Sequence, residues 1–282
     1  MALDLDLGIY GDRDSPKAAE YYLKAADQGH QGAKNNLLLQ HILGESKGQP
    51  PEAVFAQLKT AAETGDRDAQ NNLGLCFELG YSTAQDYGQA AMWYRRAAEG
   101  GLASAQFNLG GFYYEGKGLE KDLCSSLIWY TKAAEQRHEL ALLRLGWMYQ
   151  KGFGVEMNLR RAALLYLIAY KQGSARAANH LGLMFKKGLG VEQNDSLAFA
   201  LFLESVNRPD VAEAPKNLSY SRTAYYWLGR MTENGEGTRR DPRAAKRWYS
   251  RGAACGASGC VEALGRLNSK TVRKGRKSKT VN

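Results

Sequence analysis

The stretch "AQFNLGGFYYEGKGLEKDLCSSLIWYTKAAE", residues 105–135, contains a pattern that recurs along most of the chain. Its Leu-Gly pair belongs to a series in which successive pairs lie 36, 36, 36, 47 and 36 residues apart. The pairs stand at residues 73–74, 109–110, 145–146, 181–182, 228–229 and 264–265. Alanine pairs recur with the same period, from Ala25-Ala26 to Ala133-Ala134. A fixed period in this range is typical of proteins built from stacked repeats.

Each period is predicted to form two helices. In the quoted stretch, Ala105, Leu109 and Tyr113 lie at i, i+4 and i+8, on one face of a first helix. A second helix is predicted to begin near Asp122, whose side chain can accept a hydrogen bond from the first helical turn. A single helix pair cannot bury the apolar stripe, so successive pairs must stack and share a core. The sequence therefore predicts an all-α solenoid of about seven stacked helix pairs, partial ones included.

These residues resemble a known repeat family. The pattern A-x-x-x-L-G-x-x-Y-x-x-G-x-G-V-x-x-D-x-x-x-A-x-x-W-Y-x-x-A-A-x-x-G is similar to the Sel-one-like repeat (SLR), a relative of the tetratricopeptide repeat (TPR). Its clearest copies here are residues 105–135 and "ALLRLGWMYQKGFGVEMNLRRAALLYLIAYKQG", residues 141–173. The resemblance implies a right-handed α-α superhelix. It also implies a non-enzymatic adaptor or scaffold for protein–protein interactions.

The repeat register predicts the domain organisation. Residues 1–268 are expected to form a single solenoid, and residues 269–282 a basic, disordered tail. The 47-residue interval exceeds the period by 47 − 36 = 11 residues, which predicts a surface-loop insertion near residues 207–221. Pro209 and Pro215 within it argue against a continuous helix.

Composition limits the cellular setting. The 282 residues are 44% hydrophobic, enough for a sizeable core, and contain no apolar run of membrane-spanning length. The stretch "MALDLDLGIYGDRD" has neither the basic nor the apolar region of a signal peptide, so a cytoplasmic or nuclear address is expected. Four scattered cysteines are too few for a disulfide framework, and their spacing does not indicate a zinc site.

The net charge of +9 is concentrated at one end of the sequence. Six positive charges lie after residue 268, and subtracting them leaves 9 − 6 = +3 for the rest of the chain. They belong to Lys270, Arg273, Lys274, Arg276, Lys277 and Lys279. Such a segment can contact a nucleic acid or a nuclear import receptor, or it can simply be a solvated end.

Motifs with apparent chemistry fit the repeat better than they fit a catalytic site. Gly111, Gly116 and Lys117 have the spacing of a phosphate-binding loop, but Gly118 stands where that loop needs Ser or Thr, and no strand precedes it. Ser46 in "GESKG" matches a hydrolase nucleophile motif, but it is expected in a turn between helices. We therefore expect no catalytic residues, no metal and no cofactor.

The expected function is the binding of a protein or peptide partner by the first helices, which would line a concave surface. The residue before the Leu of each first helix provides a candidate contact. These residues are Asn36, Asn72, Asn108, Arg144, His180 and Trp227. For the asparagines, a structural role between repeats fits the pattern equally well. Two different functions are also compatible with the sequence, namely a nucleic-acid-associated or nuclear protein that uses the basic tail and a regulatory subunit of a larger signalling complex.

Overall fold

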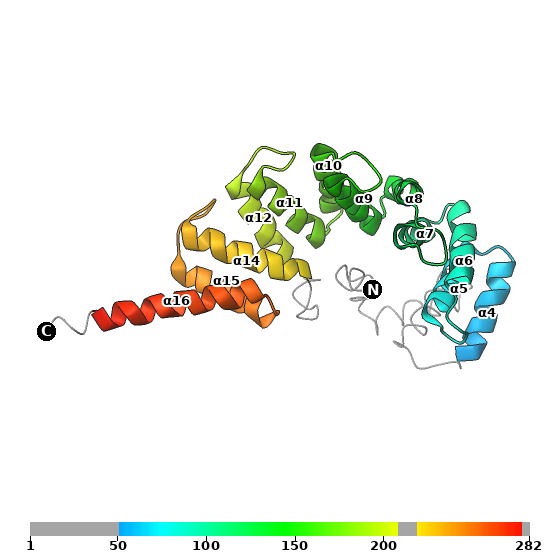
Figure 1. Cartoon of the computed structure of the whole chain (residues 1–282), viewed down its shortest axis with the longest axis horizontal. Coiled ribbons are helices and arrows are strands. Elements are labelled where there is room, and N and C mark those ends of the chain that lie inside the picture. Colours follow the sequence, from blue (N-terminus) through cyan, green and yellow to red (C-terminus); the bar gives the residue numbers. More distant parts are fainter. Residues whose placement is uncertain (1–50, 208–218, 278–282) are drawn as a thin grey trace, which may run out of the picture. The chain divides into compact units, whose positions relative to one another are not determined.

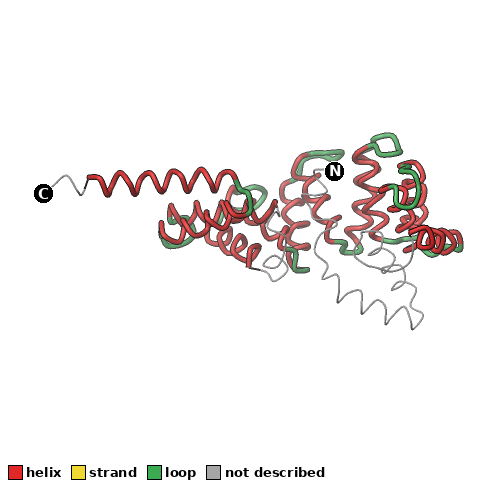
Figure 2. Tube along the Cα trace, turned by 90° about the horizontal axis from the view of Figure 1, so that it is seen from below, coloured by secondary structure: helices red, strands yellow, loops and turns green. Residues whose placement is uncertain are grey.

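The computed structural model describes residues 51–207 and 219–277, which form twelve α-helices and no strands (Figure 1). The helices are α4 (Pro51–Glu63), α5 (Arg67–Leu79), α6 (Tyr87–Glu99), α7 (Ala103–Glu115), α8 (Leu123–Glu135), α9 (Glu139–Lys151), α10 (Leu159–Lys171), α11 (Ala175–Lys187), α12 (Asp195–Asn207), α14 (Ser219–Asn234), α15 (Pro242–Ala254) and α16 (Ser258–Lys277). The all-α prediction is confirmed. Figure 2 shows these helices joined by loops.

The described helices belong to two compact units. One contains α4 to α9 and the other α10 to α16. Within each unit, first helices pack on the second helices that follow them, as α5 does on α6, α7 on α8, α11 on α12 and α14 on α15. The first helices α5, α7, α9 and α11 start 36 residues apart, as the Leu-Gly ladder predicts.

A close contact between glycine and an aromatic ring explains the Leu-Gly pairs. The glycine faces the second helix, where the tyrosine or phenylalanine ring lies directly against its backbone. A Cβ atom added at Gly74 would lie 2.8 Å from the Tyr94 ring, and one at Gly229 would lie 2.5 Å from the Tyr249 ring. Because these rings are almost fully buried, they cannot move aside. The same contact joins Gly110 to Tyr130 and Gly182 to Phe202.

The turns also follow the predicted pattern. Asp86, Asp122 and Asp241 cap second helices, each accepting a hydrogen bond from a backbone N–H of the first turn. The helix-ending position between repeats has a positive φ in every described copy. It is Arg137 in one copy, with φ of 61°, and glycine in the others, at Gly65, Gly101, Gly173 and Gly256. The backbone therefore requires the left-handed conformation there, even where the residue is not glycine.

The glycine turn that resembles a phosphate loop is a contact between repeats. Gly116 ends α7 in the left-handed conformation, and Gly118 lies against the backbone of Tyr87 at the start of α6. A side chain at Gly118 would collide with the Tyr87 carbonyl group. Gly111 lies inside α7, so the residues of the apparent motif do not form one loop.

The edges of the insertion and of the tail differ in detail from the boundaries that the sequence predicts. Residues 219–221, expected in the insertion, already belong to α14, and residues 208–218 lie outside the described part. Helix α16 continues to Lys277, into the segment expected to be disordered. This segment has no proline, and its lysines and arginines are good helix formers, so the helix that packs through Cys260 and Ala263 can extend into it.

Candidate functional site

Each unit has a candidate site on its first helices, which are α5, α7 and α9 in one unit and α11 and α14 in the other. We call the side of these helices that carries the predicted contact residues the first-helix face of that unit. The predicted contact residues lie one position before the buried leucine. Asn72, Asn108 and Arg144 belong to the unit of α4 to α9, and His180 and Trp227 to the unit of α10 to α16. Asn36 and Ser46 lie outside the described residues.

In the first unit, the asparagines contact one another across neighbouring helices. The Asn108 side-chain amide donates a hydrogen bond to Asn71 Oδ1 at 3.0 Å, which joins α7 to α5. Asn71 in turn donates to Asn72 Oδ1 at 3.4 Å. Only 4% of the Asn72 surface is exposed, so the accessible amides are those of Asn71 and Asn108. These amides form a short polar ladder with capacity left for a ligand backbone.

Arg144 occupies the next step along the same row. Only 8% of this residue is exposed, which is low for an arginine. Its guanidinium is close enough to Tyr114 of α7 to interact electrostatically with it. Arg144 therefore acts mainly between helices, with a small part of its surface available to a partner.

An aromatic cluster lies next to this row, and sequence reasoning did not select it. The rings of Trp147 and Phe153 are 4.9 Å apart, and Tyr114 lies 5.8 Å from Trp147. Trp147 is half-buried and Phe153 is 37% exposed. The position equivalent to Trp147 in α7 is Gly111, which has no side chain that could cover the Trp147 ring. A signal for this cluster was present in the sequence, because Gly111 and Trp147 are aligned departures from leucine at Leu75 and Leu183.

In the second unit, His180 is held as a neutral ring. Its imidazole stacks on Tyr166, with the ring centroids 4.6 Å apart and the planes within 8°. Burial, together with the positive charge of Arg176, lowers the His180 pKa to about 4. At neutral pH, His180 therefore offers a flat, uncharged surface and not a cation.

Trp227 is stacked in a similar way. Its ring lies parallel to Phe202, with centroids 6.3 Å apart, and the Arg230 guanidinium lies 5.2 Å from its centroid. The side chain is half-buried, so part of the indole remains available on the first-helix face.

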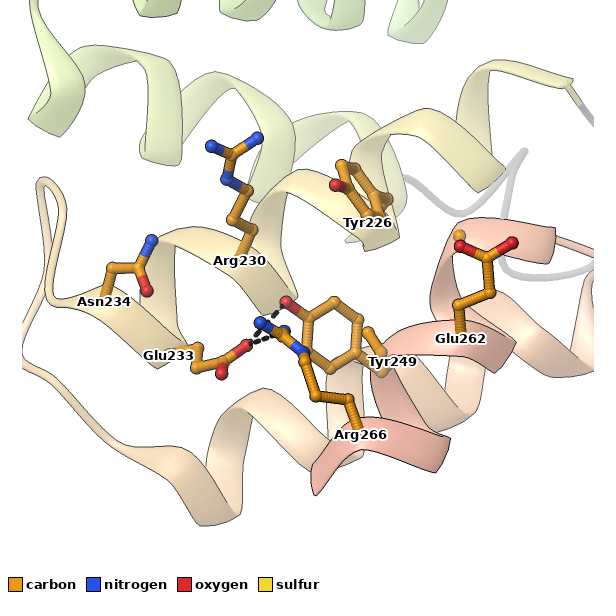
Figure 3. Close-up of a pocket in the computed structure, with 9 residues that line it drawn as sticks. Tyr226, Arg230, Glu233, Asn234, Tyr249, Glu262 and Arg266 are labelled. Carbon is orange, nitrogen blue, oxygen red and sulfur yellow. Dashed lines mark hydrogen bonds and ion pairs between the residues drawn. The ribbon is translucent and has the colours of Figure 1, made fainter. Parts of the chain in front are cut away.

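A pocket of about 460 Å³ opens between α14, α15 and α16 (Figure 3). Glu233 is the centre of its polar network. The Glu233 carboxylate accepts hydrogen bonds from the Tyr249 hydroxyl at 3.1 Å and from Arg266 at 2.6 Å. Burial and the Glu233 charge raise the pKa of Tyr249, so this hydroxyl remains a donor. The network ties α14 to α15 and α16, which gives the pocket a structural role in joining these helices.

The described residues offer no arrangement typical of a metal centre, and two of the cysteines are poor nucleophiles. No three His, Cys, Asp or Glu side chains in the described part are grouped to hold a metal ion. Cys76, Cys124, Cys255 and Cys260 are not joined in disulfides. Burial raises the pKa of Cys76 to about 12 and that of Cys260 to about 11, so both thiols are protonated at neutral pH and are poor nucleophiles.

The sequence ladder and the helix pairs identify the family. The Sel1 repeat profile matches residues 5–30, 67–102, 103–138, 140–174, 175–209 and 223–256. The chain belongs to the Sel1 repeat family. Sel1 repeat solenoids are generally scaffolds for protein–protein interaction. Residues 31–66 fall outside the match, in the copy that carries Pro50-Pro51 near its helix start.

Solved structures of other Sel1 repeat proteins are similar to this chain. A Sel1 repeat protein from Oxalobacter formigenes is 30% identical, with a TM-score of 0.64, over 72% of this chain and 79% of its own. A protective antigen present in uropathogenic Escherichia coli strains, which displays an SLR fold, is 29% identical with a TM-score of 0.61 over 88% of this chain. The present chain spans 59% of that antigen.

Two further comparisons are negative. A search of curated proteins found no match. Among the helices that the structure describes, none has the length and apolar character needed to cross a bilayer.

Proposed function

We propose that this Sel1 repeat protein is a non-enzymatic adaptor or scaffold that binds an extended segment of a protein partner on the first-helix face of the unit of α4 to α9. The observation that carries the proposal is the cluster of Tyr114, Trp147 and Phe153, whose rings are partly exposed beside polar side chains. Partly exposed aromatic anchors within a polar rim are the usual centre of binding energy in protein interfaces.

The polar ladder supplies the second half of this proposal. An extended segment has an unpaired backbone N–H and C=O at alternate positions, which the amides of Asn71 and Asn108 can meet. Asn72 and Arg144 are more buried and would position these groups. The first-helix face of the second unit would offer flat apolar contacts of its own through His180 and Trp227. Asn36 has the same repeat position, and we assign it the same role.

The assignment as a non-enzyme is supported by the chemistry of the site. The residues named for the first-helix faces are amides, aromatic rings, Arg144 and His180, with no Ser, Cys, Lys or carboxylate among them. His180 is neutral and stacked on an aromatic ring, which suits a contact surface better than a general base. Amides and aromatic rings suit recognition, so the geometry favours binding over turnover.

The proposal can be tested with a double variant, Trp147→Ala with Phe153→Ala. Proteins captured by the wild type and by the variant would be compared by quantitative mass spectrometry. A matched control is Ile128→Ala in α8, which removes a side chain of the same unit that is 53% exposed on a second helix. We expect the control to retain the partners of the wild type and the double variant to lose them at least tenfold. Equal recovery by all three proteins would exclude the aromatic cluster as the binding centre.

Nucleic-acid association through the basic tail is a second candidate, favoured by the six positive charges after residue 268. Removing residues 269–282 and measuring oligonucleotide binding across salt concentrations separates the two functions. Phosphate contacts predict an affinity that falls steeply with salt and is lost with the tail. Partner binding on the first-helix face should be unchanged by the same truncation.

A further inference from the structure

Helix α15, the last second-type helix of the described part, has an unusual charge distribution. Its sequence, Pro242–Ala254, contains Arg243, Lys246, Arg247 and Arg251 and no acidic residue. All four side chains are exposed. Together with Trp248 they border a shallow depression of about 620 Å³. We call these four cations the α15 basic face.

No salt bridge within 4 Å joins an acidic side chain of the described part to this face. Asp241 caps α15 by accepting hydrogen bonds from the backbone N–H groups of Arg243 and Ala244 at 2.9 and 3.0 Å. These hydrogen bonds, together with the charges of Arg247 and Arg243, lower the pKa of Asp241. On the neighbouring helices, Glu233 of α14 bonds to Tyr249 and Arg266, and Glu262 of α16 lines the pocket of Figure 3. Asp241 therefore offsets part of the charge of Arg243 and Arg247, and the face as a whole keeps a net positive charge.

The repeat fold does not require cations at these positions. The second helices can be aligned on their buried aromatic residue, or on Leu58 in α4. In every other second helix of the described part, the residues aligned with Lys246 and Arg247 are apolar. The equivalents of Lys246 are Phe55, Ala91, Leu127, Ala163 and Phe199, and those of Arg247 are Ala56, Met92, Ile128, Leu164 and Ala200. Cations at these two positions are therefore specific to α15, whereas the position of Arg251 is also basic in α6 (Arg96) and α8 (Lys132), and that of Arg243 is also basic in α10 (Arg160).

The arrangement is also unfavourable for the helix itself. Arg243, Arg247 and Arg251 lie at i, i+4 and i+8, so they form one ridge about 12 Å long. Like charges at this spacing repel and weaken a helix. A mixture of cations and anions would keep this surface equally well solvated. A ridge of positive charges, in contrast, is complementary to a row of carboxylates or phosphates.

The aromatic residue of the face distinguishes these two kinds of anion. The Trp248 ring is stacked with Tyr225 at 6.3 Å, and the Arg251 guanidinium lies 5.2 Å from its centroid. Since the ring is half-buried and already occupied by these neighbours, it is poorly placed to stack on a base. Single-stranded nucleic acids are usually bound by free aromatic rings together with cations. The ridge without a free ring fits carboxylates better.

We propose that the α15 basic face docks an acidic segment of a protein partner, with carboxylates spaced to meet Arg243, Arg247 and Arg251. This surface lies on a second helix and is separate from the first-helix face. It gives the scaffold a second binding site that does not depend on the first.

The test uses the full chain and three fluorescent probes of equal charge. They are a helical peptide with glutamates at i, i+4 and i+8, a scrambled peptide of the same composition, and a single-stranded oligonucleotide. The variant Arg243→Glu, Arg247→Glu, Arg251→Glu reverses the ridge. The control Lys59→Glu, Arg160→Glu, Lys171→Glu makes the same change in net charge at exposed positions of α4 and α10. The milder Arg243→Gln, Arg247→Gln, Arg251→Gln removes the charge without introducing acids, in case the reversal disturbs folding.

We expect the spaced glutamate peptide to bind the wild type and the control alike, and to lose at least tenfold in affinity with either ridge variant. The scrambled peptide should bind more weakly than the spaced one. The proposal is overturned if the peptide does not bind, if the control loses as much as the ridge variants, or if the oligonucleotide binds more tightly than the peptide in a ridge-dependent way. The last result would assign the face to nucleic acid.

Discussion

Helices α6 and α15 occupy the same place in their repeats. Their tyrosines make the same contacts, whereas two neighbouring positions are apolar in α6 and cationic in α15. On the buried side, Tyr94 of α6 packs on Gly74 and Tyr249 of α15 on Gly229. Each tyrosine hydroxyl donates to a glutamate of the preceding first helix, Tyr94 to Glu78 at 2.7 Å and Tyr249 to Glu233 at 3.1 Å.

The two positions that lie three and two residues before the tyrosine differ in chemistry and in exposure. Ala91 and Met92 of α6 are buried and half-buried, whereas their equivalents in α15, Lys246 and Arg247, are exposed. Both repeats keep the contact between the tyrosine ring and the glycine that stacking requires, because close packing tolerates few alternatives there. A position that is covered in one repeat can therefore be exposed in another, and binding specificity is expected where one repeat departs from the others.

The largest effect is expected from breaking the shared side. Gly74→Val in α5 and Gly229→Val in α14 should each reduce the free energy of unfolding by about 3 kcal/mol, because the added atoms collide with a buried ring. Urea denaturation followed by circular dichroism measures this loss. Gly265→Val in α16 is the control, since no atom lies within 4 Å of a Cβ there. A similar loss in all three variants would show that the ring contact is not the cause.

A pH effect of about 2 kcal/mol is expected at His180, where other repeats have a residue that does not titrate in this range. The folded state holds the His180 pKa at about 4, below its ordinary value of 6.5. The unfolded chain therefore binds the proton first as the pH falls, and stability is lost progressively between about pH 6.5 and 4. The difference in unfolding free energy between the wild type and His180→Gln, measured across this range, isolates the histidine from the carboxylates. A difference that does not change with pH would contradict the assignment.

Removing the shared hydroxyl should have a somewhat smaller effect. Tyr94→Phe should cost about 1.5 kcal/mol, since the Glu78 carboxylate loses its hydroxyl donor at 2.7 Å while its ion pair with Lys117 is longer, at 3.8 Å. Tyr249→Phe should cost less, because Arg266 still contacts Glu233. The repeat of α12 has Phe202 at this position and Lys186 in place of the glutamate, so Phe202→Tyr should bring no gain. Thermal and urea unfolding of the three variants would rank them, and a gain from Phe202→Tyr would refute this pairing rule.

The smallest change is a gain at the inter-repeat turn. Arg137→Gly should stabilise the protein by about 0.5–1 kcal/mol, because Arg137 has a φ of 61° that glycine adopts without strain. The reverse substitution at the equivalent position, Gly101→Arg, should destabilise it by a similar amount. Paired urea titrations would detect both shifts, and a loss of stability in Arg137→Gly would mean that the arginine side chain matters more than the backbone.

Much of the fold could be predicted from the sequence because the repeat is a set of local signals at a constant distance. Cap residues such as Asp122 and the 36-residue ladder recur from copy to copy, so each repeat supports the interpretation of the next. The boundaries near Ser219 and Lys277 were less predictable, since they depend on how far a helix extends once its beginning is packed.

The candidate site was predictable only in part. The row before each leucine could be found by counting, but counting does not show which members are buried, as Asn72 and Arg144 are. The cluster of Trp147 and Phe153 joins a helix to a turn, and its rings are brought together by packing. Summing the charges also hid the α15 basic face, because acidic residues elsewhere nearly balance its cations in the total.

The sequence by itself determined that this chain is a stack of helix pairs, because a fixed period with small residues, aromatics and caps can satisfy its backbone and bury its stripe in no other way. Only the tertiary structure decided which side chains remain available. Exposure depends on the neighbours that stacking places around each residue. It is this exposure that leaves Trp147 partly uncovered, holds His180 neutral, and presents Arg243, Arg247 and Arg251 as one ridge.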